Sequence, residues 1–177
     1  WEIDIFGKLR NAKRKSQAAY AQSEDYQQAV YSNLIANIAN TYYTLLMLDE
    51  QLEISRQTAH SWEETVSSTR ALMDAGLADE TAVSQMEATY YEVQNSVYDL
   101  EEQVSQVENS LSLLLAETPR SYPRGKLPEQ VFDVQLSTGI PLQMLSQRPD
   151  VRMAVRHLVQ AFYATHQANT AFYPFIP

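Results

Sequence analysis

Apolar residues recur at heptad spacing through the first two thirds of the chain. In the first segment the repeating positions are Tyr31, Ile38, Leu45, Leu52, Ala59, Val66 and Met73, with Leu34, Thr41, Leu48, Ser55, Trp62 and Thr69 three residues further on. In the second segment, steps of three and four alternate through Val83, Met86, Tyr90, Val93, Val97, Leu100, Val104, Val107, Leu111 and Leu114. Spacing of this kind, sustained over more than four heptads, predicts two helices that supercoil around each other with knobs-into-holes packing.

A short connection joins the two segments. No Pro or Gly lies between Gly7 and Gly76, and Gly76 can take a positive φ just past the end of the first helix. Asp79 is suited to cap the second helix, and Glu80 adds negative charge to its first turn. A connection this short forces an antiparallel hairpin over residues 8–116, with its tip at 75–79.

The tip residue Leu77 has two interpretations from sequence. It can pack against the preceding turn and fix the hairpin, or it can remain exposed at the end of the rod as a contact for a partner. A helix of more than sixty residues rises on the order of 100 Å, which exceeds a compact domain of this length. We therefore expect other helices along its sides.

The remainder of the chain is more broken. Residues 117–148 are loop-like because they contain Pro119, Pro123, Pro128 and Pro141 as well as Gly125 and Gly139, with one short helical turn expected at 141–146. Pro149 begins a further helix that is expected to reach residue 171. Residues 1–7 and 172–177 are predicted to be strand-like. The predicted fold is all-α: a long antiparallel coiled-coil hairpin with a shorter third helix.

Two neighbouring tyrosines indicate that the first helix has more than one contact face. Tyr42 and Tyr43 cannot both lie in one seam, so the first helix is expected to be contacted on more than one side. A helix with two contact faces is typical of a barrel or sheet of helices, whereas a two-stranded coil needs only one.

Charge excludes one class of partner. The chain of 177 residues has 13 Lys and Arg against 22 Asp and Glu, a net charge of −9 that argues against nucleic acid as a partner. Residues 49–110 carry fourteen acids against only Arg56 and Arg70. This surface is either a solvated acidic face or an electronegative wall that favours cations. Residues 1–20, in contrast, contain five bases.

The chemistry of an enzyme is not evident. His60, His157 and His166 have no partners at metal-ligand spacing, there is no cysteine, and no nucleotide or nucleophile motif occurs. Adjacent acids such as Glu63 and Glu64 diverge on a helix. We therefore predict no catalytic, cofactor or metal site. No run approaches the roughly 18 apolar residues of a membrane-spanning helix.

Five segments carry a resemblance to one family. They are WEIDIFGKLR at residues 1–10, ANIANTYYTLL at 36–46, AGLAD at 75–79, LSQRPDVR at 145–152 and AFYPFI at 171–176. Together they resemble outer-membrane efflux proteins of the TolC type, and the multidrug-efflux lipoprotein branch most of all, in order and spacing over essentially the whole chain. Residues 1–10 resemble the point where such proteins leave the membrane β-barrel for the long periplasmic helix.

The resemblance implies a homotrimer anchored in the Gram-negative outer membrane by a β-barrel, whose helices form a tunnel through the periplasm below it, a passive conduit without a cofactor. It implies docking of the helical tip to a periplasmic adaptor that connects to an inner-membrane pump. Carried over by position, the docking residues are Ala75, Gly76, Leu77 and Ala78. The chain would then be a fragment of a subunit whose membrane strands lie outside it.

The chain departs from the family pattern at Ala82, where Asp is common, and at Val155, where Glu is frequent. The alternative to a channel subunit is a stand-alone coiled-coil scaffold or adaptor, which accounts for the heptads but not for the strand-like ends. A signal peptide with a lipobox cysteine upstream, together with alternating ten-residue strands beyond Pro177, would favour the channel, and further coiled-coil repeats would favour the scaffold.

Overall fold

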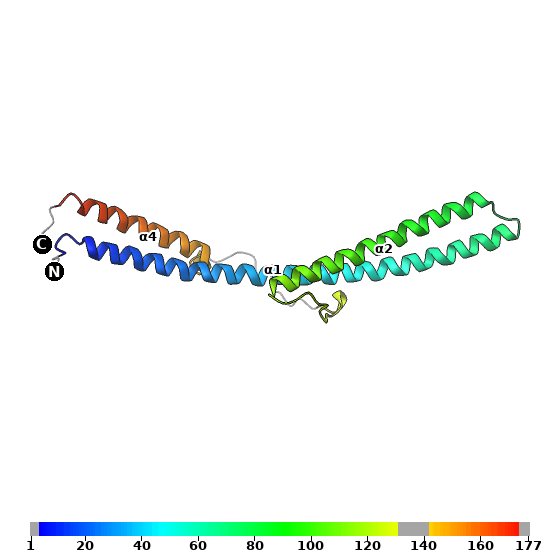
Figure 1. The fold of residues 1–177 in the computed structure, drawn as a ribbon, viewed down its shortest axis with the longest axis horizontal. Coiled ribbons are helices and arrows are strands. Elements are labelled where there is room, and N and C mark those ends of the chain that lie inside the picture. The colour runs from blue at the N-terminus through cyan, green and yellow to red at the C-terminus, as the bar shows by residue number, and fades with distance from the viewer. Residues whose placement is uncertain (1–3, 131–141, 174–177) are drawn as a thin grey trace. The chain divides into compact units, whose positions relative to one another are not determined.

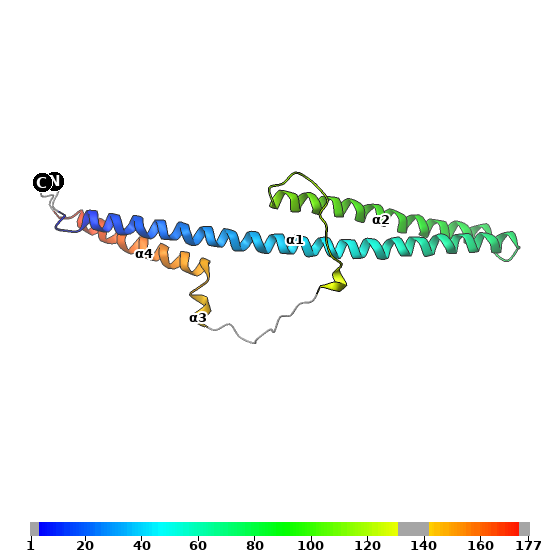
Figure 2. The ribbon, with the colours of Figure 1, turned by 90° about the horizontal axis from the view of Figure 1, so that it is seen from below.

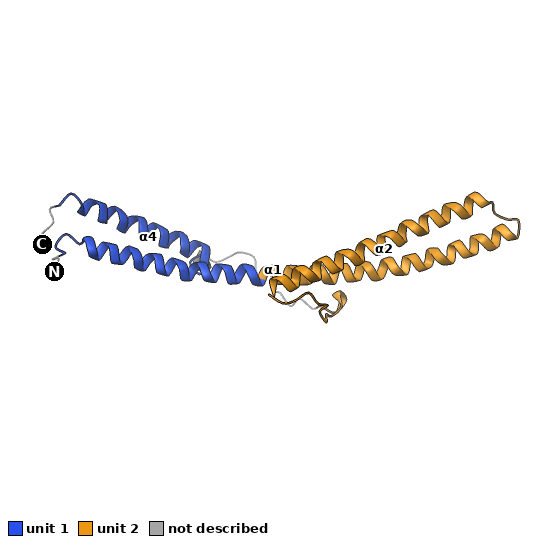
Figure 3. Cartoon of the chain, viewed as in Figure 1, with its two compact units in different colours: residues 1–35, 134–177 blue, residues 36–133 orange. Residues whose placement is uncertain are grey.

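The computed structural model describes residues 4–130 and 142–173, and these residues are helical and irregular without any strand (Figure 1). The elements in chain order are α1 (Lys8–Asp74), α2 (Glu80–Leu114), the 3-10 helix η1 (Leu127–Glu129), α3 (Leu142–Leu145) and α4 (Pro149–Thr170). The chain divides into two compact units, one of residues 1–35 with 134–177 and one of residues 36–133 (Figure 3). We call them unit 1 and unit 2. Helix α1 contributes to both.

Unit 2 is an antiparallel helical hairpin. Arg56 pairs with Glu101 at 2.6 Å, and Arg70 pairs with Glu87. A step of fourteen residues forward along α1, from Arg56 to Arg70, is thus matched by fourteen residues backward along α2, which is two heptads of a constant antiparallel register. Figures 1 and 2 both show α2 beside the second half of α1.

The buried side chains of this hairpin follow the heptads. The apolar side chains that are at most 8% exposed and lie in the seam are Leu45, Leu48, Ala59, Val66, Val83, Val97 and Leu111. The half-buried seam positions include Leu52, Trp62, Met86, Val93, Leu100, Val104 and Val107. Burial of these aliphatic and aromatic side chains is the main source of stability for the pair.

The heptad pattern overstates how far this seam runs. Tyr31 is 58% exposed, although the repeat includes it. The reason is a difference in length, because α1 has 67 residues and α2 only 35, so α2 pairs with no more than the second half of α1.

Two sides of α1 are covered where α2 ends. The neighbours Leu45 and Leu46 point to different sides of the helix, and both are almost fully buried, at 0% and 1% exposure. This is the kind of two-sided contact that the Tyr42–Tyr43 pair suggests for the same stretch.

Unit 1 pairs the first part of α1 with α4. Arg152 Nε lies 3.0 Å from Asp25 Oδ1, and Phe6 stacks on Tyr173 with ring centroids 4.6 Å apart. Since contacts move toward the N-terminus of α1 as they move toward the C-terminus of α4, the two helices run antiparallel (Figures 1 and 2). The heptad analysis did not anticipate this pairing.

Several predicted boundaries differ from the observed ones. Residues 4–7 form a bend without strand structure, because a strand requires a neighbouring strand for its backbone hydrogen bonds and none is present in the described residues. The predicted helix end at 116 is wrong by two residues, since α2 ends at Leu114 and Ala116 adopts a φ of 55°. The loop-like region 117–148 contains η1, which was not predicted, and α3, which agrees with the short helical turn predicted at 141–146. Residues 174–177 of the expected C-terminal strand lie outside the described residues.

Candidate functional site

The first half of the hairpin turn is a helix C-terminus of the Schellman type. Gly76 N–H donates to the carbonyl of Met73 at 2.9 Å, and Leu77 N–H donates to that of Leu72 at 2.9 Å. Gly76 has a φ of +75°, and a Cβ added there would meet nothing within 4 Å. Glycine is therefore required for its backbone conformation and not for space.

The second half of the turn caps α2. Asp79 is extended, with φ −103° and ψ 166°, and its Oδ1 accepts a hydrogen bond from Ala82 N–H at 2.8 Å. Glu80 follows in the first turn, where a negative charge interacts favourably with the helix dipole. Ala82, which departs from the family pattern in its side chain, takes part in the cap through its backbone.

Leu77 projects into solvent at this turn. Its side chain is 77% exposed, and Leu72, its partner in a hydrophobic contact of a Schellman motif, is 48% exposed. Leu77 is therefore not buried by the turn, so packing within the hairpin does not account for a leucine here.

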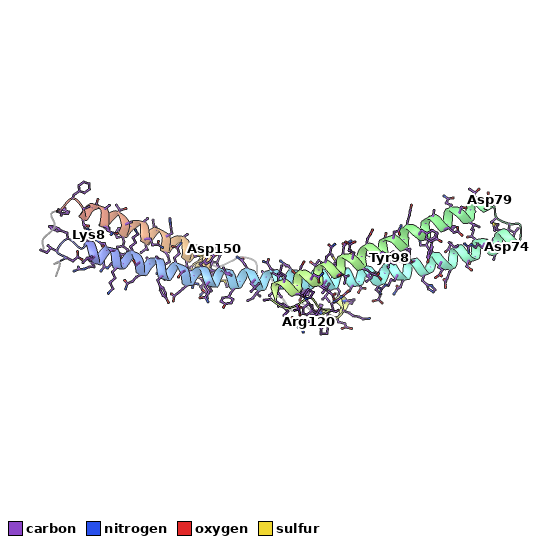
Figure 4. All side chains as sticks on the ribbon, in the orientation of Figure 1. Lys8, Asp74, Asp79, Tyr98, Arg120 and Asp150 are labelled. Carbon is purple, nitrogen blue, oxygen red and sulfur yellow. The ribbon has the colours of Figure 1, made fainter. Side chains whose placement is uncertain are left out.

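Negative charges surround the apolar tip. Asp74 ends α1 and Asp79 caps α2, on the two sides of residues 75–78 (Figure 4). With Glu80, three exposed carboxylates lie within a few residues of Leu77. The end of the hairpin thus presents one exposed leucine within an acidic border.

The acidic hairpin surface contains few internal ion pairs. Arg56 and Arg70 each pair with a glutamate of α2, and His60 lies 3.6 Å from both Glu63 and Glu64 on the exposed face of α1. These side chains are mostly more than a third exposed, so solvent screens their interactions and each contributes little to stability. No group of three or more His, Asp and Glu side chains suited to a metal ion occurs in the described part of the chain.

A cluster of charged side chains, which the sequence analysis did not predict, binds the segment after α2 to the hairpin. Arg124 donates to Asp49 Oδ1 of α1 at 2.7 Å and also pairs with Glu108 of α2. The Arg124 side chain is only 15% exposed, and its hydrogen bond to Asp49 raises the pKa of its guanidinium above the ordinary value. One arginine thus links three segments. We call Arg124, Asp49 and Glu108 the arginine clasp.

A tyrosine completes this attachment. Tyr122 OH donates to Ser112 Oγ at 3.0 Å, and Ser112 is 1% exposed. Ser121 Oγ donates to Glu108 Oε1 at 2.8 Å. No local pattern marks these residues, because their partners lie between 10 and 75 positions away along the chain.

Unit 1 contains one buried carboxylate. Asp25 is 8% exposed and faces two arginines of α4, with Arg152 Nε at 3.0 Å from Oδ1 and Arg156 Nε at 3.6 Å from Oδ2. Arg152 also bonds Gln28 of α1. These contacts, one helical turn apart on each helix, hold α4 in register on α1.

Comparison with known proteins identifies the family. A family model described as "Outer membrane efflux protein" matches residues 1–117, about two thirds of the chain. The chain belongs to the outer membrane efflux protein family. Membership locates the protein in the outer membrane of Gram-negative cells, with this helical part in the periplasm.

Characterised relatives span the whole chain. The cation efflux system protein CusC of Escherichia coli O6:H1 is 28% identical and the probable outer membrane lipoprotein SilC of Salmonella typhimurium is 32% identical, each over 99% of this chain. The toluene efflux pump outer membrane protein TtgF of Pseudomonas putida is 31% identical over 99% of the chain. The chain covers only 38%, 38% and 37% of the lengths of these three relatives.

Solved structures show the same fold. The outer-membrane channel OprN matches with a TM-score of 0.91 at 25% identity, over 99% of this chain and 40% of that one. A CusC structure matches with a TM-score of 0.86 at 26% identity, over 99% and 41%. The chain therefore has the fold of the periplasmic α-barrel part of these TolC-like channels. Among the residues that the structure describes, no helix is long and apolar enough to cross a membrane.

Proposed function

We propose that this chain forms part of the wall of a periplasmic tunnel in an outer-membrane efflux channel, a passive conduit in a tripartite export system, and that residues 75–78 dock to a periplasmic adaptor. The channel is a homotrimer and not an enzyme, and the adaptor connects it to an inner-membrane pump. Support comes from membership of the efflux protein family and from a fold shared with efflux channels over 99% of the chain.

The observation that carries the docking role is the exposure of Leu77. A leucine that is 77% exposed at the end of a hairpin leaves apolar surface in water, which a partner would cover. The positive φ of Gly76 and the Asp79 cap hold this side chain on a defined turn. A defined turn lowers the entropy that must be lost when a partner binds.

Substitution of Leu77 in the full-length protein tests this role. Leu77→Asp is expected to weaken crosslinking to the adaptor and to lower resistance to exported compounds, because a fourth carboxylate is then desolvated at the contact. The control is Leu113→Asp, which changes a leucine that is 81% exposed at the other end of α2. Crosslinking and resistance at wild-type levels in Leu77→Asp, with the protein present in the membrane at normal amount, would refute docking at the tip.

The charge of unit 2 bears on what passes through the tunnel. Its described residues carry sixteen Asp and Glu side chains against five Lys and Arg. An acidic lumen raises the local concentration of cations, and the relatives from three Escherichia coli strains are named as cation efflux system proteins. We expect the full-length channel to prefer cations in planar bilayers under a salt gradient. A reversal potential without cation preference would exclude an acidic lumen and leave the tip proposal unaffected.

A further inference from the structure

The start of α1 carries a concentration of positive charge that the proposed channel role does not use. Lys8, Arg10, Lys13, Arg14 and Lys15 are all exposed. We call these five residues the basic collar. At about 100° per residue they are distributed around the helix. The side toward α4 carries Ala18, which is buried, and Arg14, whose guanidinium lies 5.7 Å from the centroid of the Tyr163 ring of α4.

The basic collar has no acidic partner in the part of the chain that the structure describes. None of the five side chains forms an ion pair within residues 4–130 and 142–173, in contrast to Arg124, Arg148 and Arg152. The nearest carboxylate along the chain, Asp4, accepts hydrogen bonds from the backbone N–H groups of Leu9 at 3.2 Å and Arg10 at 2.9 Å. Those bonds lower the pKa of Asp4 and engage it in capping the helix. Lys8, Arg10, Lys13 and Lys15 thus remain available to an external anion, while Arg14 lies over the ring of Tyr163 and still contributes its charge.

Exposed aromatic and aliphatic side chains lie beside this charge. Phe6 and Tyr173 stack with ring planes 10° apart, which joins the residues before α1 to those after α4. Phe172 is 89% exposed, Ile5 62% and Leu9 53%. Figure 4 shows Lys8 at this same end of unit 1. Exposed aromatic rings next to lysines and arginines are typical of protein surfaces at a membrane–water interface.

Unit 1 and unit 2 carry net charges of opposite sign. The described residues of unit 1 carry eight Lys and Arg side chains against four Asp and Glu side chains, whereas unit 2 is strongly acidic. Unit 1 is therefore basic although the whole chain has a net charge of −9. An anionic surface would attract unit 1 and repel unit 2.

We propose that the basic collar, with the adjoining rings of Phe6, Phe172 and Tyr173, binds the anionic headgroups of phospholipids at a membrane surface. The lysines and arginines contact the phosphates, and the aromatic rings enter the headgroup layer. Charge complementarity selects an anionic membrane over a neutral one, and the exposed rings select a membrane over a dissolved anion. The inference is independent of docking at Leu77, because a different unit carries it.

Vesicle flotation with the 177-residue chain tests the proposal. We expect binding to phosphatidylcholine vesicles that contain about one third phosphatidylglycerol, weak binding to pure phosphatidylcholine, and a decline as salt shortens the Debye length below about 10 Å. A basic residue near an anionic surface strengthens binding about five-fold. The double variant Lys13→Gln with Lys15→Gln is then expected to bind about 25-fold more weakly.

A matched variant controls for net charge. Arg120→Gln with Lys126→Gln removes the same two charges from exposed positions in unit 2 and is expected to bind vesicles as the unmodified chain does. Phe172→Ser is expected to weaken binding without changing its salt dependence. Circular dichroism at 222 nm establishes that each variant keeps its helices.

Four results would overturn the proposal. They are equal binding to neutral and anionic vesicles, an equal loss in the control variant, full displacement by millimolar inorganic phosphate, and binding to duplex DNA in preference to vesicles. Displacement by phosphate would identify a site for a dissolved anion, and preference for DNA would identify a nucleic-acid surface. A failure of Leu77→Asp to affect adaptor binding would leave the membrane result unchanged.

Discussion

The C-terminal ends of α1 and α2 both form a Schellman motif. They differ in the residue at the position of the motif that has a positive φ. At the end of α1, Gly76 has a φ of +75°. At the end of α2, Ala116 has a φ of 55°, while Ala116 N–H donates to Leu113 at 3.1 Å and Glu117 N–H donates to Ser112 at 2.9 Å. An alanine therefore occupies the left-handed position that glycine adopts without steric cost.

Exchanging the two residue types should change stability in opposite directions. The left-handed conformation costs an L-residue about 1–2 kcal/mol relative to glycine, and glycine loses about 0.4–1 kcal/mol more backbone entropy on folding. Since a Cβ at Gly76 would meet nothing within 4 Å, no steric clash adds to the conformational cost. We expect Gly76→Ala to lower the free energy of unfolding by about 1 kcal/mol, and Ala116→Gly to raise it by about 0.5–1 kcal/mol.

Urea denaturation followed by circular dichroism measures both effects. With a slope of about 2 kcal/mol per molar urea, a change of 1 kcal/mol moves the midpoint by about 0.5 M. The control is Gly125→Ala, at a glycine without positive φ, where the added Cβ would lie 3.2 Å from the side-chain amide nitrogen of Gln130. An unchanged or higher midpoint for Gly76→Ala, or a lower one for Ala116→Gly, would refute the assignment of these conformations.

Three further predictions follow from the contacts of unit 2. Asp79→Ala should lower the free energy of unfolding by about 1 kcal/mol, since it removes the acceptor for Ala82 N–H, whereas Asp79→Asn should retain most of the cap; thermal unfolding of both variants distinguishes them. Arg124→Met should cost about 2 kcal/mol, because Asp49 and Glu108 lose a largely buried partner, and it should speed tryptic cleavage of residues 117–130; an unchanged cleavage rate would contradict the clasp. The Arg56–Glu101 pair should give a coupling of no more than about 0.5 kcal/mol in a double-mutant cycle, decreasing with salt, because both side chains are over 40% exposed.

The two compact units of this chain also differ in the sign of their charge. Unit 2 combines the exposed Leu77 with the acidic surface, and unit 1 combines the basic collar with exposed rings. A protein that must meet a partner at one place and a membrane at another needs surfaces of different chemistry. The two proposals accordingly rest on different residues and are tested by different variants.

Local pattern was sufficient to predict the hairpin. The heptads of Leu45 to Val66 and of Val83 to Leu111 specify which side chains meet, and the turn follows from Gly76 and Asp79 acting on their immediate neighbours. The all-α class and the family resemblance also come from the sequence. The helices, their buried faces and the turn depend on residues within a few turns of one another, so periodicity and capping preferences encode them, whereas the resemblance rests on motifs spread along the chain.

Tertiary structure alone decided the rest. The exposure of Leu77 shows that the turn does not bury it, and the difference in length between α1 and α2 explains why Tyr31 is not in the seam. The arginine clasp joins residues as many as 75 positions apart. No local propensity specifies such contacts, because side chains distant in sequence become neighbours only when helices of different length have packed together.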